Sequence, residues 1–590
     1  MLAEDTAWQI RNQPYGVVVQ IVRRKSWLLL LLLLIVLVYL LVGFVPENRD
    51  FLWGFPYVHD SYDWSKQKLF YPVSNYTPLP TGQPLSLPPV QFPFREDKSP
   101  AGVAREAVLA SRRNEVKDAF VKSWKAYKTV GFGYDEVLPV SGGGYNEYGF
   151  GKWGATLVDS LSTLWIMDLK DDFHEAVAAA VTRDYSKDNE TSCLYFEITI
   201  RHLGGLLGAY DLSKETALLE KAVELGDILY MDYDTPNRMP GATLDFRDAR
   251  TGRQLAGNHD PSASVASSSM EFSRLSQLTG DNKYYDAINR VTQVLNEWQN
   301  KTQLPGMWPT YLDLRNEALD GVNSFTLGSS ADSLYEYLGK TFVLLGGLEP
   351  VYEKMYRAAM DTVTKHILFR PKMPDQADIL FPGNVMVSSL GPILTAQSQH
   401  LSCFVGGMFG LGGKIFQIPE HVAIAEKITK GCVWAYDAMP AGIMPEVFSL
   451  LNCEGLEPCA WSQEQWEAVG NTTLKPGFVG VQDARYLLRP EAIESVFYMY
   501  RITGNAEYQD MAWAMFQAIR KAAETDLAFS SIESVTVADT VRTNSMQSFW
   551  LAETLRYFYL IFSSPDLISL DEYVFNTEAH PLRRPLPASS

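Results

Sequence analysis

The chain has 590 residues, of which 46% are hydrophobic and 12% aromatic, so it can bury a large core and is not a disordered polypeptide. Its formal net charge of −18 argues against nucleic acid, or any anionic surface, as its partner. This excess of acids is compatible with a neutral polar ligand, or with a cation held among carboxylates.

The first distinct segment is apolar and suits a membrane. Residues 27–45 contain no charged side chain, follow a basic run at 23–25, and precede the charged residues Glu47, Arg49 and Asp50. At 1.5 Å per residue, roughly 19 helical residues just span the hydrocarbon layer. The positive-inside rule predicts a cytosolic tail (1–26), a single transmembrane anchor (27–45) and a luminal remainder. A cleaved signal peptide is the alternative, although its apolar region is usually shorter.

Two further features agree with a luminal location. Asn-X-Thr triplets, the acceptors for N-glycosylation, begin at Asn75, Asn189, Asn300 and Asn471. There are five cysteines and no C-x-x-C motif, which favours disulfides over zinc and leaves one odd cysteine. From their spacing, Cys453 and Cys459 could close a small local loop.

Proline dominates the segment after the predicted anchor. Six prolines lie between residues 78 and 93, and such segments prefer extended conformations. We expect residues 46–101 to be a luminal stem that forms no core and holds the folded domain away from the membrane.

From about residue 102 the apolar periodicity is helical. Val116, Phe120, Trp124 and Tyr127 mark the buried face of the first helix. Further helices are predicted at 153–169, 194–210, 215–230, 262–279, 282–297, 330–346, 351–367, 398–413, 419–436, 487–502, 506–523 and 544–562. Few strands are expected, with short hairpins in loops such as 234–260.

A weak internal repeat predicts how these helices pair. Residues 275–284 and 500–508 both read as a helix that ends near glycine, a turn, and a tyrosine that opens the next helix. About fourteen helices in consecutive hairpins indicate an all-α toroid or solenoid over residues 102–582, with 583–590 as a tail. In a closed ring the loops at one end crowd a central cavity.

Acidic residues recur at the starts of apolar helices. Glu491 and Glu494 follow Pro490 on one face of a helix, where a plain interpretation is ordinary capping near the positive end of the helix dipole. An acid on an apolar helix is costly to bury without a partner, a metal or a polar ligand. Similar acids therefore predict one shared polar cavity: Glu197 beside Arg201, Asp332 with Glu336, Glu271, and Glu553.

Seven ordered motifs make the chain resemble the class I α-1,2-mannosidases, glycoside hydrolase family 47, and among them the type II membrane enzymes of the ER and Golgi. The resemblance covers about residues 105–582, and the motifs lie at 154–160, 196–207, 332–338, 400–404, 488–495, 548–555 and 574–581.

This resemblance implies an (α/α)7 barrel with Ca²⁺ at its floor. It also implies removal of terminal α-1,2-linked mannose from high-mannose N-glycans with inversion at the anomeric carbon. Inversion needs one carboxyl to protonate the leaving oxygen and another, roughly 6.5–9.5 Å away, to activate water. Glu197 matches the family's proposed acid and Glu491 its proposed base. Asp332 matches a third essential carboxylate whose role stays open.

The resemblance also implies a wider set of site residues. Thr577 matches the calcium ligand, and Phe549 matches a ring that packs against mannose. Arg201 and Arg489 would keep neighbouring acids ionised and oriented. Carboxylates that would hold calcium-bound waters are Glu336, Glu446, Glu494 and Glu553. Asp159, Glu271 and Glu446 match acids that line the cavity, although the first two could equally be satisfied core acids. Cys403 and Cys432 match the family's disulfide.

Three positions depart from the family pattern. Ser330 stands where the ER enzyme that trims one mannose usually has arginine and the Golgi enzymes leucine, which indicates broader trimming. Ser264 replaces a common glutamate, and Gln547 replaces the usual acid before the Ser548-Phe549 pair. None of the three catalytic matches is affected, so we predict an active enzyme.

Two other classes of function compete with the hydrolase. One is a mannose-binding, lectin-like quality-control factor of the same family that does not turn over its glycan. The other is a type II membrane glycosyltransferase, for which Asp232-Tyr233-Asp234 is a D-x-D match that short acid-rich patterns also produce by chance.

Overall fold

The computed structural model describes residues 50–52, 55–186 and 191–587. The predicted cytosolic tail and membrane anchor (1–45) and the Asn189 triplet lie outside these ranges. Within them, no helix is both long and apolar enough to cross a membrane.

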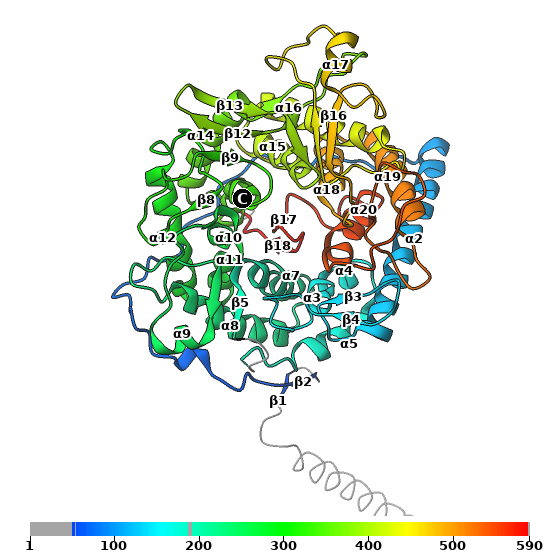
Figure 1. Ribbon diagram of the computed structural model, residues 1–590. Helices are drawn as coiled ribbons and strands as arrows, with labels where there is room; N and C mark the ends of the chain where they lie inside the picture. The colour runs from blue at the N-terminus through cyan, green and yellow to red at the C-terminus, as the bar shows by residue number, and fades with distance from the viewer. Residues whose placement is uncertain (1–49, 53–54, 187–190, 588–590) are drawn as a thin grey trace, which may run out of the picture.

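Helices in consecutive pairs form a ring, which Figure 1 shows in chain order around a centre occupied by the C-terminal hairpin. The helices that pack as neighbouring pairs are α4 (Leu161–Ile166) with α5 (Lys170–Ala180), α7 (Gly204–Ser213) with α8 (Thr216–Tyr230), α11 (Ser269–Thr279) with α12 (Asn282–Trp298), α13 (Asp332–Leu344) with α14 (Val351–His366), α15 (Phe404–Ile415) with α16 (Pro419–Ala438), and α18 (Glu491–Thr503) with α19 (Glu507–Ala523). The first long helix, α2 (Pro100–Ala126), packs against the last, α20 (Leu555–Ile561), so the two ends of the ring meet.

The two members of a pair differ in burial. Helices α13, α15 and α18 are buried on nearly every side, as expected of helices that face the middle of the ring. Helices α12 and α14 bury one stripe and leave the opposite face to solvent. In α2 the predicted face is confirmed, because Val116, Phe120 and Trp124 are buried.

Several predicted helices are divided in the structure. The segment 262–279 forms α10 (Ser262–Ala266) and α11, with a break between them. Short helices α3 (Ala155–Asp159), α6 (Tyr195–Glu197), α9 (Phe246–Thr251) and α17 (Gln463–Val469) complete the set. Wider, π-helical turns follow at Tyr127–Gly131, Ile198–Leu203 and Trp550–Thr554. Such turns are rare and are frequent at functional sites.

Strands are short and confined to the connections. They are β1 (Asp50–Leu52), β2 (Phe55–Tyr57), β3 (Glu136–Val137), β4 (Gly144–Tyr145), β5 (Ser192–Leu194), β6 (Thr243–Asp245), β7 (Asp260–Pro261), β8 (Tyr311–Leu312), β9 (Ser324–Thr326), β10 (Leu368–Phe369), β11 (Phe381–Pro382), β12 (Asn384–Ser388), β13 (Gly391–Thr395), β14 (Gln397–Gln399), β15 (Val447–Leu450), β16 (Phe478–Asp483), β17 (Tyr573–Phe575) and β18 (Pro581–Arg583). Two three-stranded sheets, β13-β12-β9 and β14-β15-β16, exceed the short hairpins that we expected. The antiparallel hairpin β17–β18 lies in the centre of the ring.

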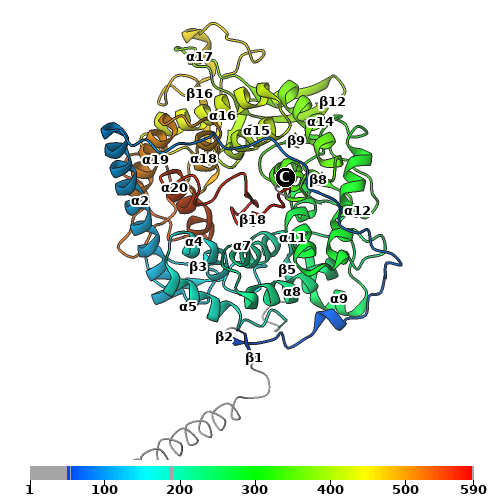
Figure 2. The ribbon, with the colours of Figure 1, turned by 180° about the vertical axis from the view of Figure 1, so that it is seen from behind.

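The proline-rich segment differs from the predicted free stem. Residues 55–99, here called the strap, contribute Tyr57, Trp64 and Val90 to the buried core. Figure 2 shows the strap as a dark blue line that passes α9 and α12 and reaches α2. The prediction that this segment forms no core was therefore wrong for its described part.

The strap is fixed because its backbone finds acceptors on the helical body. The N–H groups of Phe70 and Tyr71 donate to the carboxylate of Asp234 at 2.8 and 2.9 Å. Further along, Thr77 donates to Asp286 and Val90 to Asp571. An extended chain cannot satisfy its own N–H groups, so carboxylates of the helical body and its connections supply the acceptors that a sheet would otherwise provide.

Two disulfides are present. Cys403–Cys432 joins α16 to the short turn before α15, as the family resemblance implied, and Cys453–Cys459 closes the small loop whose spacing made it a candidate. The fifth cysteine, Cys193, is buried on β5 and takes part in neither disulfide.

Candidate active site

One cavity of about 420 Å³ brings together the predicted catalytic carboxylates. Glu197 ends α6, Asp332 begins α13, and Glu491 begins α18. Residues that line the cavity include these three and Arg201, Glu336, Arg489, Glu494, Phe549, Glu553 and Thr577. Ser264, Ser330 and Gln547, the three departures from the family pattern, also line it.

The N-terminal ends of buried helices supply the acids. Pro490 caps α18, and Glu491 and Glu494 occupy its first turn, where the helix dipole favours negative charge. Asp332 accepts a hydrogen bond of 2.8 Å from the N–H of Ser333 in the first turn of α13. Two helix starts therefore aim carboxylates into the same space.

Glu491 is held in its ionised form. The Nδ1 atom of His400 donates to Oε2 of Glu491 at 3.0 Å, and Nη1 of Arg489 lies 3.6 Å from Oε1. Burial alone would raise the pKa of Glu491, but the His400 hydrogen bond and the Arg489 charge lower it below its ordinary value. Tyr436 bonds to the other nitrogen of His400 at 2.8 Å and fixes the ring.

Asp332 has the opposite environment. Burial, followed by the charges of Glu336 and Glu491, raises the pKa of Asp332 to about 7. The hydrogen bonds from Ser333 act in the other direction but do not offset the desolvation. Near neutral pH the cavity thus holds one carboxyl that is protonated in a large fraction of molecules and one that is ionised, which is the arrangement an acid–base pair requires.

Glu197 is oriented by an arginine with several partners. Nε of Arg201 donates to Oε2 of Glu197 at 2.9 Å, while Nη1 of Arg201 lies 2.5 Å from Glu578 and 3.7 Å from Asp159. The guanidinium also lies 5.7 Å from the ring centre of Phe549. Arg201 is buried among acids, so its position is fixed and it fixes Glu197 in turn.

At the floor, carboxylates outnumber their cationic partner. Lys340 is buried and forms an ion pair with Glu336, and its Nζ lies 3.5 Å from Glu494. Burial raises the pKa of Glu494 to about 8. Burial, then the charge of Glu578, raises the pKa of Glu553 well above its ordinary range. Burial also raises the pKa of Glu578 well above its ordinary range, although the charge of Arg201 acts in the other direction. Oε2 of Glu578 is buried without a hydrogen-bond partner.

Three predicted cavity-lining acids lie instead one layer behind the wall. Asp159 accepts a hydrogen bond of 2.9 Å from His580. Glu271 accepts from Tyr337 at 2.7 Å and from Asn576 at 2.8 Å, and Glu446 pairs with Arg489. Each bonds to partners from neighbouring elements and none of the three lines the cavity, although one oxygen of Asp159 and one of Glu271 are buried without a hydrogen-bond partner.

Some members of the site were missed in the sequence. Glu578 follows Thr577 directly, so the adjacency was an available signal. Lys340 stands four residues after Glu336, the spacing of a helical ion pair. His400 opens the 400–404 motif, but its role was not visible in the sequence, because only the fold brings it to Glu491, 91 positions away.

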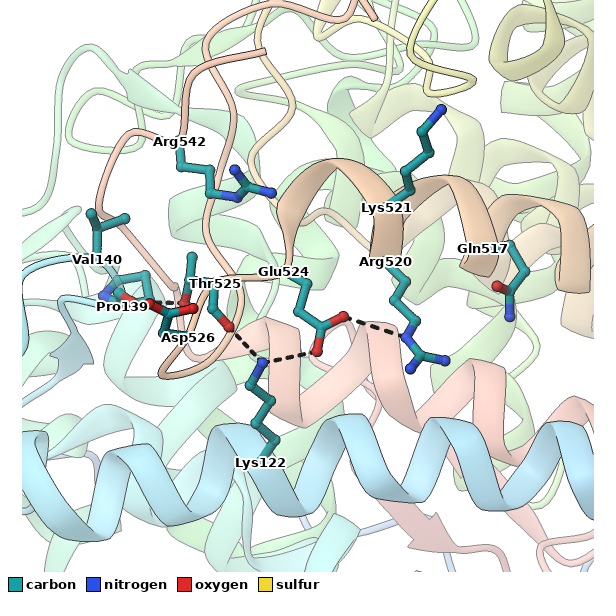
Figure 3. Close-up of a pocket in the computed structure, with 10 residues that line it drawn as sticks. All are labelled: Lys122, Pro139, Val140, Gln517, Arg520, Lys521, Glu524, Thr525, Asp526 and Arg542. Atoms are coloured by element: carbon teal, nitrogen blue, oxygen red, sulfur yellow. Dashed lines mark hydrogen bonds and ion pairs between the residues drawn. The ribbon is translucent and has the colours of Figure 1, made fainter. Parts of the chain in front are cut away.

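A larger groove lies elsewhere and has a different character. It encloses about 850 Å³ between α2, α19 and the loops that follow β3 and α19. In Figure 3, Lys122 reaches Glu524 and the carbonyl of Thr525, and Glu524 lies between Lys122 and Arg520. The groove is therefore lined by charges of both signs at the protein surface, and none of the acids predicted for the site lies in it.

The D-x-D match is structural. Asp232 is buried and accepts hydrogen bonds from Gly241 at 3.0 Å and from Gln254 at 2.6 Å. Asp234 binds the strap and pairs with Arg238 at 2.9 Å. Both carboxylates already have partners, which leaves the glycosyltransferase hypothesis without its site.

The sequence and the fold were compared with known proteins. The pattern of glycosyl hydrolase family 47 matches residues 119–584. The chain is 34% identical over 489 residues to the human endoplasmic reticulum mannosyl-oligosaccharide 1,2-alpha-mannosidase, covering 80% of this chain and 64% of that protein. It is 32% identical over 504 residues to mouse mannosyl-oligosaccharide 1,2-alpha-mannosidase IB, covering 84% and 73%.

A solved structure agrees. The alpha-1,2-mannosidase from Trichoderma reesei superposes with a TM-score of 0.72 at 29% identity, covering 80% of this chain and 99% of that one. The chain belongs to glycosyl hydrolase family 47.

Proposed function

We propose that the protein is a calcium-dependent, inverting α-1,2-mannosidase that removes terminal mannose from high-mannose N-glycans. The observation that carries the proposal is a cavity in a family 47 chain where Glu491 and Asp332 have pKa values pushed in opposite directions. Environments that separate two carboxyls in this way mark a base and an acid.

In this mechanism Glu491 is the base that takes a proton from water. Its ionised carboxylate is held by His400 and Arg489, so that it is ready to accept. The water attacks the anomeric carbon from the face opposite the leaving oxygen, and the configuration inverts. General-base assistance of this kind contributes roughly 10²–10⁴-fold to the rate.

Glu197 and Asp332 form the acid side. Asp332 retains the proton near neutral pH because it is buried, and Glu197, which matches the family's acid, is positioned by Arg201. We propose that the proton reaching the leaving oxygen comes from this pair, with Asp332 as its reservoir.

The remaining residues bind and orient the sugar. Phe549 offers a ring face, and Arg201 and Arg489 keep the acids in place. Glu336, Glu494 and Glu553 present oxygens to hydroxyl groups. Three acids behind the cavity wall hold other side chains in position. Asp159 bonds to His580, Glu271 to Asn576, and Glu446 to Arg489.

The floor fits a Ca²⁺ ion. Among the described residues no three acidic, histidine or cysteine side chains are close enough to ligate a metal together. Thr577 offers a hydroxyl and a carbonyl there, and the crowded carboxylates Glu336, Glu494, Glu553 and Glu578 outnumber the two cations beside them, Lys340 and Arg201. Ca²⁺ takes six to eight oxygens and accepts waters among them, so the acids would hold those waters. When bound, the ion supplies positive charge and coordination for sugar hydroxyls.

We further propose that the ring is the family's (α/α)7 barrel, and that residues 27–45 anchor it as a type II protein facing the lumen of the ER or Golgi. The names of the relatives and the charge pattern of the sequence support this location. A role in degradation of misfolded glycoproteins would follow from the same trimming.

The test is to give the detergent-solubilised full chain a nine-mannose oligosaccharide, with and without a calcium chelator. Chelator-sensitive release of mannose, first seen by NMR as the β-anomer, is the expected result. Binding of the glycan with no mannose released would instead establish the lectin-like alternative. Release of the α-anomer would overturn the inverting assignment.

A further inference from the structure

A further pocket, open to solvent, lies at the other end of α13 from Asp332. It has a volume of about 350 Å³, and α13 runs thirteen residues, or about 20 Å, between the two sites. Three parts of the chain form its walls: strap residues 79–84, the end of α11 with Leu345 and Leu348, and residues 583–585 after β18. We call it the arginine pocket.

The arginine pocket has cationic walls and no acid. Arg274, Arg583 and Arg584 line it, and the other lining residues are apolar apart from Gln277. The protein as a whole carries a net charge of −18, so a pocket with three cations and no carboxylate is a local reversal of sign.

The three arginines are not equally occupied. Arg274 binds Asp211 through two hydrogen bonds, of 2.6 and 2.8 Å. The exposed side chain of Arg583 makes no hydrogen bond or ion pair within the described ranges. Arg584 is only 8% exposed, and neither its Nε nor its Nη1 has a hydrogen-bond partner there.

A buried guanidinium with two nitrogens that lack acceptors is unusual and costly. Buried charges in proteins are normally paired, because desolvation is not repaid otherwise. The charge of Asp571, whose Oδ1 accepts a hydrogen bond from Val90 of the strap, acts on Arg584 but does not offset its burial, which lowers the pKa of Arg584. Arg584 therefore has hydrogen-bonding capacity that its described neighbours do not use.

We propose that the arginine pocket binds a phosphate group. Guanidinium forks match phosphate oxygens, and Arg583 and Arg584 are adjacent in sequence on the same wall. The pocket volume lies at the lower limit of small-molecule sites. Its apolar wall, made of Leu345, Leu348 and the strap prolines, can contact an apolar group attached to the phosphate. The phosphate is either free, as in inorganic phosphate, or the headgroup of an anionic lipid.

Binding would connect three separate parts of the chain. The strap contributes Leu79, Pro80, Gly82 and Pro84, while the arginines belong to the helical body and the C-terminal segment. A ligand that contacts all of them favours the folded, strapped state over the unfolded one. The expected consequence is stabilisation, with no change in the chemistry at the distant cavity.

The experiment uses the full chain in detergent micelles and follows thermal unfolding. One arm adds inorganic phosphate against chloride at equal ionic strength, and the other adds phosphatidic acid against phosphatidylcholine to the micelles. The variants are Arg584→Gln, Arg584→Lys and Arg583→Gln. Arg253→Gln is the matched control, because it removes an exposed arginine that lies outside the pocket.

We expect the Tm of the unaltered protein and of R253Q to rise by a few degrees in at least one arm. Without ligand, R584Q should unfold at the same temperature or higher, because it removes an unpaired buried charge, and its response to phosphate should be lost. R583Q should show a smaller response, and R584K should keep part of it. A response in the first arm identifies free phosphate, and a response only in the second identifies a lipid headgroup.

The proposal is overturned if neither probe raises the Tm, or if R584Q and R583Q respond as fully as R253Q. Because R583Q alters an exposed side chain, the test stands even where R584Q folds poorly. Mannose release is measured in parallel and should be equal in all variants, so the result does not depend on the proposed glycosidase activity.

Discussion

The two ends of α13 offer cavities of opposite charge. At its start, seven carboxylates and two arginines line the candidate active site. At its end, the arginine pocket has three arginines and no acid. A helix dipole favours anions at its N-terminus and cations at its C-terminus, and both cavities follow that sign.

The dipole alone does not balance either cavity. Glu494, Glu553 and Glu578 have raised pKa values, and Arg584 has a pKa lowered by burial, so both sites are under electrostatic stress. The comparison teaches that each site needs a ligand of opposite charge. The candidate active site at the start of α13 needs a cation beside its sugar, and the arginine pocket at the end of α13 needs an anion. Changes at the first end should alter turnover, and changes near the second should alter stability.

The largest effect is expected from Glu491→Gln at the first end. Loss of the base should lower kcat/KM by roughly 10²–10⁴-fold, because the amide cannot accept a proton from water. Mannose release measures the loss, and thermal unfolding should show an intact fold. The control is Lys521→Gln in the larger groove between α2 and α19, which should leave kcat/KM unchanged. Near-normal activity in E491Q would remove Glu491 from the mechanism.

Next in size is Trp64→Ala in the strap, which should affect stability without affecting turnover. Trp64 is buried against Tyr62 and Phe246, and truncating a buried tryptophan costs roughly 3–5 kcal/mol. Denaturant unfolding measures the loss, and kcat/KM of the folded protein at low temperature should not change. A stability equal to that of Phe70→Ala, which removes an exposed ring, would mean that the strap is not part of the core.

The pH dependence of kcat/KM tests the contrast between Asp332 and Glu491 in the candidate active site. Asp332 must be protonated to supply the proton and has a pKa of about 7, so kcat/KM should fall as pH rises through 7. Glu491 must be ionised and has a lowered pKa, so activity should persist on the acidic side down to below its ordinary pKa of about 4.3. A profile that stays flat from neutral pH to about pH 9 would contradict the role of Asp332.

The smallest effect is expected from the local disulfide. Cys453–Cys459 spans a sequence separation of 6, and Cys403–Cys432 a separation of 29. In the chain-entropy model these loops contribute about 2.4 and 3.6 kcal/mol respectively. Replacing both cysteines of each pair by serine and comparing denaturant midpoints measures the difference. Equal losses would show that native contacts, and not loop length, set the contribution.

Much of the architecture was available from the sequence. Apolar periodicity predicted the long helices, and in α2 and α18 it identified the buried face, because side chains at i, i+3 and i+4 share one side of a helix. Carboxylates on apolar helices are costly to bury without a partner, so Glu197, Asp332 and Glu491 could be assigned to one polar cavity, which the structure confirms; their catalytic roles come from the family resemblance and stay a proposal. The family resemblance implied the Cys403–Cys432 disulfide, whereas the spacing of Cys453 and Cys459 made them a candidate pair whose pairing the structure decided.

Only the tertiary structure decided the rest. His400 meets Glu491, and Arg584 comes to lie beside Arg274, through contacts between distant segments that local spacing does not encode. The strap was misjudged because proline content reports the conformation of a segment, whereas burial depends on whether a neighbouring surface accepts its backbone N–H groups. Sequence patterns determine which elements form and which residues carry charge; packing determines which charges acquire partners and which are left to a ligand.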